Sequence, residues 1–258
     1  MRRYLSVLGA LLLAAIIGGA SMNAFGFLGF GNSKSWKEEV LLHDGRKIVV
    51  ERTVERGGRH EIGQKPAYKE QSLRFISSAT GQIIEWQDHF SADLGQANFL
   101  PFALGIVKNT PYLVVVPMGC LAYNKWGRPN PTYVIFQYDS KQWTRVSLQD
   151  LPTEIQTPNL IFSMPDVEVE RLGVNFVSAE EIKKLLSDYR QLEYKTILRE
   201  PMPNAGGRCG HMVRTEDGGW IGIGWFSDQP SLSACLKYCK RKRVGAQDCP
   251  CENIFKGE

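Results

Sequence analysis

Residues 40–52 read Val-Leu-Leu-His-Asp-Gly-Arg-Lys-Ile-Val-Val-Glu-Arg, and this stretch sets the fold class. Two β-prone runs flank the pair Asp44-Gly45. Asp-Gly is a preferred pair in tight hairpin turns because both residues tolerate positive φ angles. The stretch therefore predicts two antiparallel strands joined at Asp44-Gly45. His43 lies beside the turn, where nothing orients its imidazole, so we interpret it as a turn residue and not a catalytic one.

Further β-prone runs follow this hairpin at short, regular intervals. Their links have hairpin length and are rich in turn residues, as in Ser78-Ala79-Thr80-Gly81. The runs at residues 112–116 and 132–138 are apolar at consecutive positions, so we expect both faces of those strands to be covered. Eight strands with such links predict a mainly β fold, an antiparallel meander folded as a sandwich or a partly closed barrel. The other runs cover residues 73–76, 82–86, 102–107 and 143–146.

Three motifs stand out along this β-rich part of the chain. They are Trp36-Lys37-Glu38-Glu39-Val40-Leu41-Leu42-His43-Asp44-Gly45-Arg46, the later Trp126-Gly127-Arg128-Pro129-Asn130-Pro131, and a Tyr-rich strand that ends at Trp143. Together they resemble a group of uncharacterised exported proteins of Gram-negative bacteria, over a span from Trp36 to Pro152. The resemblance implies an envelope location and assigns no activity.

The connection between residues 120 and 131 is the one long, aromatic and proline-rich link in the middle of the chain. Tyr123 and Trp126, with Arg128 close by, could form a stacking platform for a sugar or a groove for a peptide. The same aromatic rings could instead cap the end of the sheet, and this is the interpretation we favour. If the chain binds a ligand, this loop is where the sequence places it.

A packing helix is predicted after a proline-rich link. Ser178 and Glu181 form a capping box. One face of the helix that follows carries Ile182, Leu185, Leu186 and Tyr189. The chain accordingly divides into a leader over residues 1–30, a β-rich domain over 36–165, a link with its packing helix over 166–200, and a small cysteine-rich α+β tail over 201–258.

The leader has the layout of an export signal. Arg2 and Arg3 precede an apolar run of 17 residues from Tyr4 to Ala20, and small residues end the run. Either a signal peptide cleaved after Ala20 or Gly26, or a retained membrane anchor followed by a Gly/Phe spacer, fits this pattern. Both alternatives place the bulk of the chain outside the cytoplasm, in the periplasm or anchored in the inner membrane.

Four cysteines near the carboxyl terminus form two close pairs. Cys235 and Cys239 are spaced to share one face of a helix, and Cys249 and Cys251 are spaced to share one face of an extended segment. The bridges Cys235–Cys249 and Cys239–Cys251 follow most directly from this geometry, and the crossed pairing is also open. Export favours disulfides over free thiols.

Cys120 and Cys209 remain as a third bridge by elimination. A zinc site is the alternative for the four clustered cysteines, with His211 as a spare ligand. A catalytic Cys209 with His211 is a weaker hypothesis, because no third group is evident and one thiol would have to stay unpaired.

A basic patch follows the helix that carries Cys235 and Cys239. The patch concentrates five positive charges, at Lys237, Lys240, Arg241, Lys242 and Arg243. Cations near a helix carboxyl terminus are favourable locally, so a solvated face is the simpler interpretation. A functional interpretation is contact with anionic lipid headgroups or another envelope polyanion. The formal net charge of +4 gives no global signature of polyanion binding, and nucleic acid is not an expected partner of an exported chain.

These patterns predict a non-catalytic binding or structural module of the envelope, with an envelope protein, a glycan or an anionic surface as partner and with no cofactor. An envelope hydrolase is the alternative. No nucleophile elbow and no zinc-protease helix is present in the sequence. A hydrolase would gain support if several of the following converged in one pocket: His60, His89, His211, Asp88 and Glu85.

Overall fold

The computed structural model of the chain describes residues 32–58, 60–139 and 141–256. The leader and its predicted export signal or membrane anchor lie outside these residues. Within the described residues, no helix combines the length and the apolar character that a membrane crossing requires.

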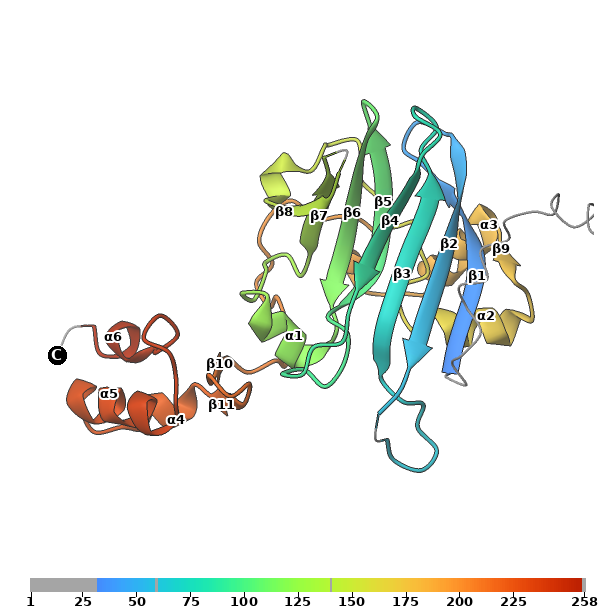
Figure 1. Ribbon diagram of the computed structural model, residues 1–258. Helices are drawn as coiled ribbons and strands as arrows, with labels where there is room; N and C mark the ends of the chain where they lie inside the picture. The colour runs from blue at the N-terminus through green and yellow to red at the C-terminus, as the bar shows by residue number, and fades with distance from the viewer. Residues whose placement is uncertain (1–31, 59, 140, 257–258) are drawn as a thin grey trace, which may run out of the picture. The chain divides into compact units, whose positions relative to one another are not determined.

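The eight predicted strands are all present, and the mainly β fold class is confirmed (Figure 1). With the short strand β9, which was not predicted, they form two sheets, of order β4-β3-β2-β1-β9 and β5-β6-β7-β8, and neither sheet closes into a barrel. All pairs are antiparallel except β9, which is parallel to β1. The strands are β1 (Asn32–Leu41), β2 (Lys47–Arg56), β3 (Tyr68–Ile76), β4 (Ile83–Asp88), β5 (Phe99–Val107), β6 (Thr110–Pro117), β7 (Val134–Tyr138), β8 (Trp143–Val146) and β9 (Phe176–Val177).

The predicted hairpin at Asp44-Gly45 joins β1 to β2. The Leu42 amide donates to the Arg46 carbonyl at 2.8 Å, and Gly45 adopts a φ of 83°, which its missing side chain permits. The Asp44 carboxylate accepts from the amide and the guanidinium of Arg46, and these hydrogen bonds hold the pKa of Asp44 below its usual range. The turn is therefore stabilised by its own residues.

Strand β6 is covered on both faces, as its consecutive apolar residues predicted. Leu113 and Val115 pack in a core between the two sheets, and Val114 and Val116 pack in a second core on the other side of β6. The second core also takes up the proline-rich link through Ile161 and the packing helix. The same core includes Trp36 and Val54 of the five-stranded sheet, so the link packs against both sheets.

The packing helix α3 (Ala179–Ser187) begins at Ser178, as predicted. The Ser178 hydroxyl accepts from the Glu181 amide, and the Glu181 carboxylate accepts from the Ser178 amide. A second helix, α2 (Pro165–Leu172), was not predicted. It starts with Pro165 in its first turn and ends at Gly173, whose φ of 68° stops the helix.

A buried ion pair joins β1, β2 and the link. The Arg52 guanidinium donates to the Glu38 carboxylate at 3.0 Å, and both side chains are almost completely buried. Glu38 also accepts from the Trp36 indole at 2.7 Å and from the Ile161 amide at 3.1 Å, while Arg52 donates to the Ile161 carbonyl. The pair therefore provides hydrogen-bond partners for the amide and the carbonyl of Ile161 in the link.

Replacing Arg52 tests the contribution of this pair. Arg52→Met leaves the Glu38 carboxylate buried without its cation, and we expect it to lower the free energy of unfolding by about 3–5 kcal/mol, measured by urea denaturation. Arg74→Met is the matched control, because Arg74 forms an exposed ion pair with Glu51 and its loss is expected to cost less than about 1 kcal/mol. Equal losses for the two variants would contradict the assigned role.

Candidate functional site

The predicted aromatic loop begins as a helix. Residues Gly119–Lys125 form α1, so the expectation of a loop is wrong over this part, and an irregular segment follows from Trp126. Tyr123 is only 5% exposed. The Trp126 ring lies 4.5 Å from the Phe99 ring, and its indole donates to the Asn98 side chain at 3.2 Å. The Trp126 ring thus packs at the end of the sheet and the Tyr123 ring is buried, while the ligand-loop hypothesis stays a prediction.

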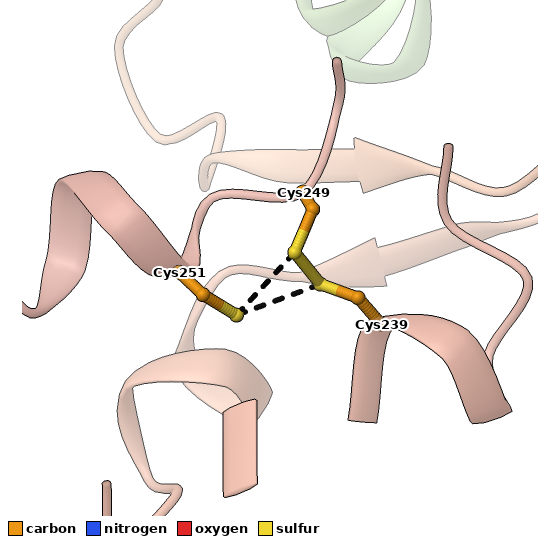
Figure 2. Close-up of side chains that lie close together, drawn as sticks. All are labelled: Cys239, Cys249 and Cys251. Atoms are coloured by element: carbon orange, nitrogen blue, oxygen red, sulfur yellow. Dashed lines mark hydrogen bonds between the residues drawn. A yellow bond between two sulfur atoms is a disulfide. The ribbon is translucent and has the colours of Figure 1, made fainter. Parts of the chain in front are cut away.

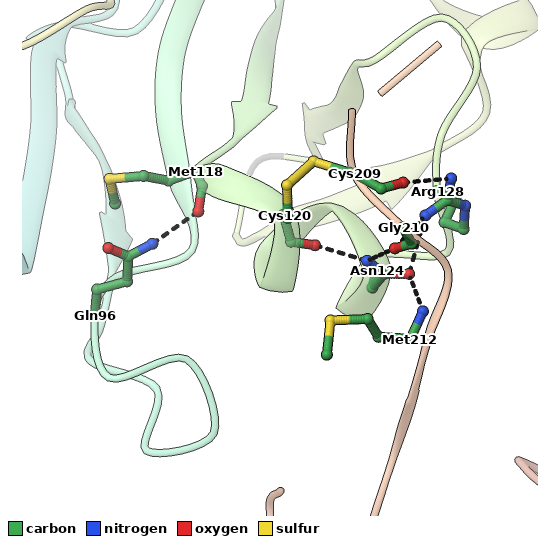
Figure 3. The surroundings of a disulfide bond; sticks show 8 residues. All are labelled: Gln96, Met118, Cys120, Asn124, Arg128, Cys209, Gly210 and Met212. Carbon is green, nitrogen blue, oxygen red and sulfur yellow. Dashed lines mark hydrogen bonds between the residues drawn. A yellow bond between two sulfur atoms is a disulfide. The ribbon is translucent and has the colours of Figure 1, made fainter. Parts of the chain in front are cut away.

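Arg128, the third residue of that hypothesis, contacts the cysteine-rich region. Its guanidinium donates to the Cys209 and Gly210 carbonyls at 3.0 Å each (Figure 3). It also lies over the Tyr123 ring, 4.9 Å from the ring centre. With a further hydrogen bond to the Asn124 side-chain oxygen at 3.1 Å, contacts within the chain use three of the five N–H donors of Arg128.

Asn124 holds the same segment from α1. Its amide nitrogen donates to the Gly210 carbonyl at 3.0 Å, and its amide oxygen accepts from the Met212 backbone at 2.9 Å (Figure 3). Close by, the bridge Cys120–Cys209 joins α1 to this segment covalently, which confirms the pairing inferred by elimination. The junction between α1 and the cysteine-rich region therefore combines a disulfide with hydrogen bonds from the Asn124 and Arg128 side chains to the backbone of residues 209–212.

A second polar contact involves Asp93. Lys125 and Arg214 both form ion pairs with its carboxylate, at 3.0 and 2.9 Å, and the Trp220 indole donates to its carbonyl at 2.8 Å. Burial raises the pKa of Asp93, but the hydrogen bonds from Ser91 and Lys125 and the two positive charges outweigh burial, so the pKa lies below its usual value. Asp93 is therefore an ionised anchor for residues on both sides of the junction.

The cysteine-rich region contains a small hairpin, three helices and two disulfides. The bridges are Cys235–Cys251 and Cys239–Cys249, so the structure has the crossed pairing and not the one that spacing favoured. The elements are β10 (Met212–Arg214), β11 (Trp220–Gly222), α4 (Gly224–Ser227), α5 (Leu232–Arg241) and α6 (Cys251–Ile254).

The direction of the chain explains this correction. After α5 the chain reverses, with the Val244 amide donating to the Cys239 carbonyl at 3.0 Å, so the returning segment reaches the end of α5 first. Cys249 therefore meets Cys239, and Cys251 meets Cys235 one turn earlier. The expectation of an extended segment at residues 249–251 is also wrong, because Pro250 has helical φ and ψ angles and α6 begins at Cys251.

The two bridges pack sulfur against sulfur. The Cys251 sulfur lies 3.5 Å from the sulfurs of both Cys239 and Cys249 (Figure 2). All three cysteines are in disulfides and lack a thiol hydrogen, so these are van der Waals contacts. Three sulfurs within 4.8 Å of one another have the spacing of metal ligands, but as disulfides they offer no thiolate to zinc.

The residues that would support a hydrolase have separate partners. The buried Asp88 carboxylate accepts from the amides of Asn98 and Phe99, while the exposed His89 imidazole pairs with Glu70 at 2.6 Å. Elsewhere, His60 contacts the Gly58 carbonyl, Glu85 is exposed on β4, and burial and the nearby Arg128 charge lower the pKa of His211. The geometry adds no observation in favour of a hydrolase.

All five side chains of the predicted basic patch are exposed. Lys237, Lys240 and Arg241 belong to α5, and Lys242 and Arg243 follow it. Among the described residues, one ion pair involves the patch, from Arg243 to Asp217 at a long 3.9 Å. The patch is thus an exposed cluster of positive charges with little internal compensation.

A groove beside α3 is a feature that the sequence pattern did not reveal. It has a volume of about 560 Å³ and is mainly apolar. One face of α3, the end of β1 and the segments around Pro158 and Tyr194 form its walls. Leu41, a large apolar residue at the end of β1, is 45% exposed, and this exposure marks one wall of the groove. Spacing on α3 marked the helix face but not the opposing walls.

A comparison with protein-family models, with curated proteins and with solved structures found no match for this chain. The resemblance to exported proteins therefore stays a prediction. The function has to be argued from the residues of the chain itself.

The disulfide pairing can be mapped chemically. Trypsin cleaves after Lys237 and Lys240 and so separates Cys235 from Cys239, and fragmentation at the Cys249–Pro250 bond separates the other two cysteines. Tandem mass spectrometry of the unreduced protein is expected to link residues 238–240 to the fragment ending at Cys249. A link from residues 238–240 to the fragment that starts at Pro250 would show the opposite pairing.

Gly206 tests the packing at the junction. A Cβ at Gly206 would lie 2.2 Å from the Tyr123 ring, whereas one at Gly207 would meet open space, and both residues have positive φ. Gly207→Ala is expected to cost about 1 kcal/mol from backbone strain, and Gly206→Ala a further 1–3 kcal/mol, roughly, from overpacking. Urea denaturation of the two variants measures the difference, and equal stabilities would refute the contact.

Proposed function

We propose that this chain is a non-catalytic binding module of the bacterial envelope whose cysteine-rich region binds the anionic surface of a membrane. The observation that carries the proposal is the exposed basic patch, defined by Lys237, Lys240, Arg241, Lys242 and Arg243. A cluster of four to eight Lys and Arg residues next to a membrane is the usual determinant of binding to acidic lipids.

The local role of these charges accounts for only part of the patch. Lys240 and Arg241 lie in the last turn of α5, where the helix dipole favours cations. Lys237 lies a turn earlier, and Lys242 and Arg243 lie beyond the helix. The surplus of positive charge therefore exceeds what capping the helix requires, and an anionic partner would neutralise it.

The two disulfides supply the rigidity that such a surface needs. Cys235 and Cys239, both buried, fix the inner face of α5 to the returning chain, and Tyr238 packs edge-on against the Phe226 ring. The opposite face of α5 carries Lys237 and Lys240 into solvent. Binding would then cost little conformational entropy beyond that of the lysine and arginine side chains.

A membrane is the partner that the remaining observations favour. Leu236 directly precedes Lys237 on α5 and is 39% exposed. The exposed face of the helix therefore combines an apolar side chain with cations, as interfacial helices do. The predicted leader would bring the chain to a bilayer, and all six cysteines form disulfides, as expected in an oxidising compartment.

Vesicle binding tests the proposal. Full-length protein is mixed with phosphatidylcholine vesicles containing or lacking phosphatidylglycerol, and the preference for anionic vesicles is measured by flotation. The triple variant K237Q/K240Q/K242Q is expected to reduce that preference by roughly two orders of magnitude, at about 1 kcal/mol for each charge. Raising the salt concentration should weaken the binding of the wild-type protein in the same way.

The matched control removes three exposed lysines outside the cysteine-rich region, in K108Q/K141Q/K184Q. None of the three forms an ion pair within the described residues. Since net charge changes equally, an equal loss in both triple variants would assign the preference to overall charge and refute the role of the patch. Stronger binding to heparin than to anionic vesicles would indicate a glycan instead of a membrane.

A further inference from the structure

The groove beside α3 shares no residue with the basic patch. Its volume of about 560 Å³ lies in the range of small-molecule sites. Ala179, Ile182 and Leu186, three and four residues apart on α3, form one wall. Leu41 and Pro158 face this wall, so an apolar ligand chain would find apolar side chains on two sides.

The walls of the groove are firmly held. Ile182 and Leu186 belong to the core, at 2% and 7% exposure. Tyr194 packs its ring against Phe162 at 5.1 Å and against Tyr189 at 5.7 Å. The groove is therefore preformed and would not have to open for a ligand.

Four charged residues line the rim of the groove, namely Glu39, Glu180, Lys183 and Lys195. Glu39 and Glu180 share one cation, because the Lys47 ammonium lies 2.9 Å from the first and 3.3 Å from the second. Hydrogen bonds from Lys47 and from the Ala179 amide also lower the pKa of Glu39, so this carboxylate stays ionised and occupied. These two carboxylates share one ammonium, so the acidic side of the rim keeps a net charge of −1, and Lys183 and Lys195 bring the rim as a whole to +1.

The basic side of the rim is not compensated. Lys183 and Lys195 line the groove, are exposed, and form no ion pair among the residues that the structure describes. Lys183 comes from α3 and Lys195 from the turn after Tyr194, so two ammonium groups from separate segments flank one apolar cavity. An anionic head with an apolar tail matches this arrangement in both charge and polarity.

We infer that the groove binds a single-chain anionic amphiphile, with the acyl chain against Leu41, Ile182 and Leu186 and the carboxylate between Lys183 and Lys195. The charge-assisted hydrogen bonds to the two ammonium groups provide the selection for an acid over a neutral lipid. Envelope membranes supply ligands of this class as free fatty acids.

Photolabelling of the full-length protein in lipid nanodiscs tests this site. A decanoate carrying a diazirine is expected to label peptides from residues 157–159, 179–187 and 194–195. Unlabelled decanoate should compete with it, and decanol should compete at least fivefold more weakly. K183Q/K195Q should reduce labelling by about tenfold, consistent with the loss of two charge-assisted contacts.

A control variant on the same helix separates binding in the groove from a general effect of charge. Lys184→Gln removes an equally exposed lysine of α3 that does not line the groove, and it should leave labelling unchanged. Leu41→Asn should lower labelling through the apolar wall alone. Labelling spread over other segments, equal competition by decanol, or an equal loss with Lys184→Gln would each overturn the inference.

Discussion

The buried pair of Glu38 and Arg52 constrains the rest of the fold. Burying two charges is costly unless each is paired and hydrogen-bonded, so the positions of their partners are tightly restricted. In the β1–β2 ladder Arg52 lies opposite Trp36, and a slip of either strand by one residue would turn its member of the pair to the outer face and break the ion pair. The ion pair therefore fixes the register of the hairpin from which the sheet is built.

The same pair determines where the proline-rich link runs. Prolines remove backbone donors, so this segment cannot satisfy itself with helix or ladder hydrogen bonds. Glu38 accepts from the Ile161 amide and Arg52 donates to its carbonyl, which supplies both partners from the sheet. The Arg52 guanidinium also lies over the Trp36 ring, 5.2 Å from the ring centre. Its Nη2 makes no hydrogen bond within the described residues, so the ring covers a polar group that has no partner. The link then leads to α2 and α3, and so to the groove.

Features encoded by neighbouring residues could be predicted from the sequence, and features encoded by chain reversal could not. The hairpin at Asp44-Gly45 and the cap at Ser178 depend on residues four or fewer positions apart, and both form as expected. Which cysteine pairs with Cys235 and which with Cys239 depends on the path of the nine residues after α5, and residue spacing does not specify that path. The groove was hidden for a related reason, since four segments distant in sequence make its walls.

The two proposed surfaces differ in what they can recognise, although both are basic. The patch on α5 presents cations on a convex helix face, where only a partner that is itself extended and anionic can contact several of them at once. At the groove, two lysines flank an apolar cavity, so a ligand gains from charge only if its chain also fits between α3 and Leu41. Salt weakens exposed charge contacts far more than burial of an apolar chain. High ionic strength should therefore separate the two surfaces, releasing a partner held by charge alone while leaving the apolar part of groove binding intact.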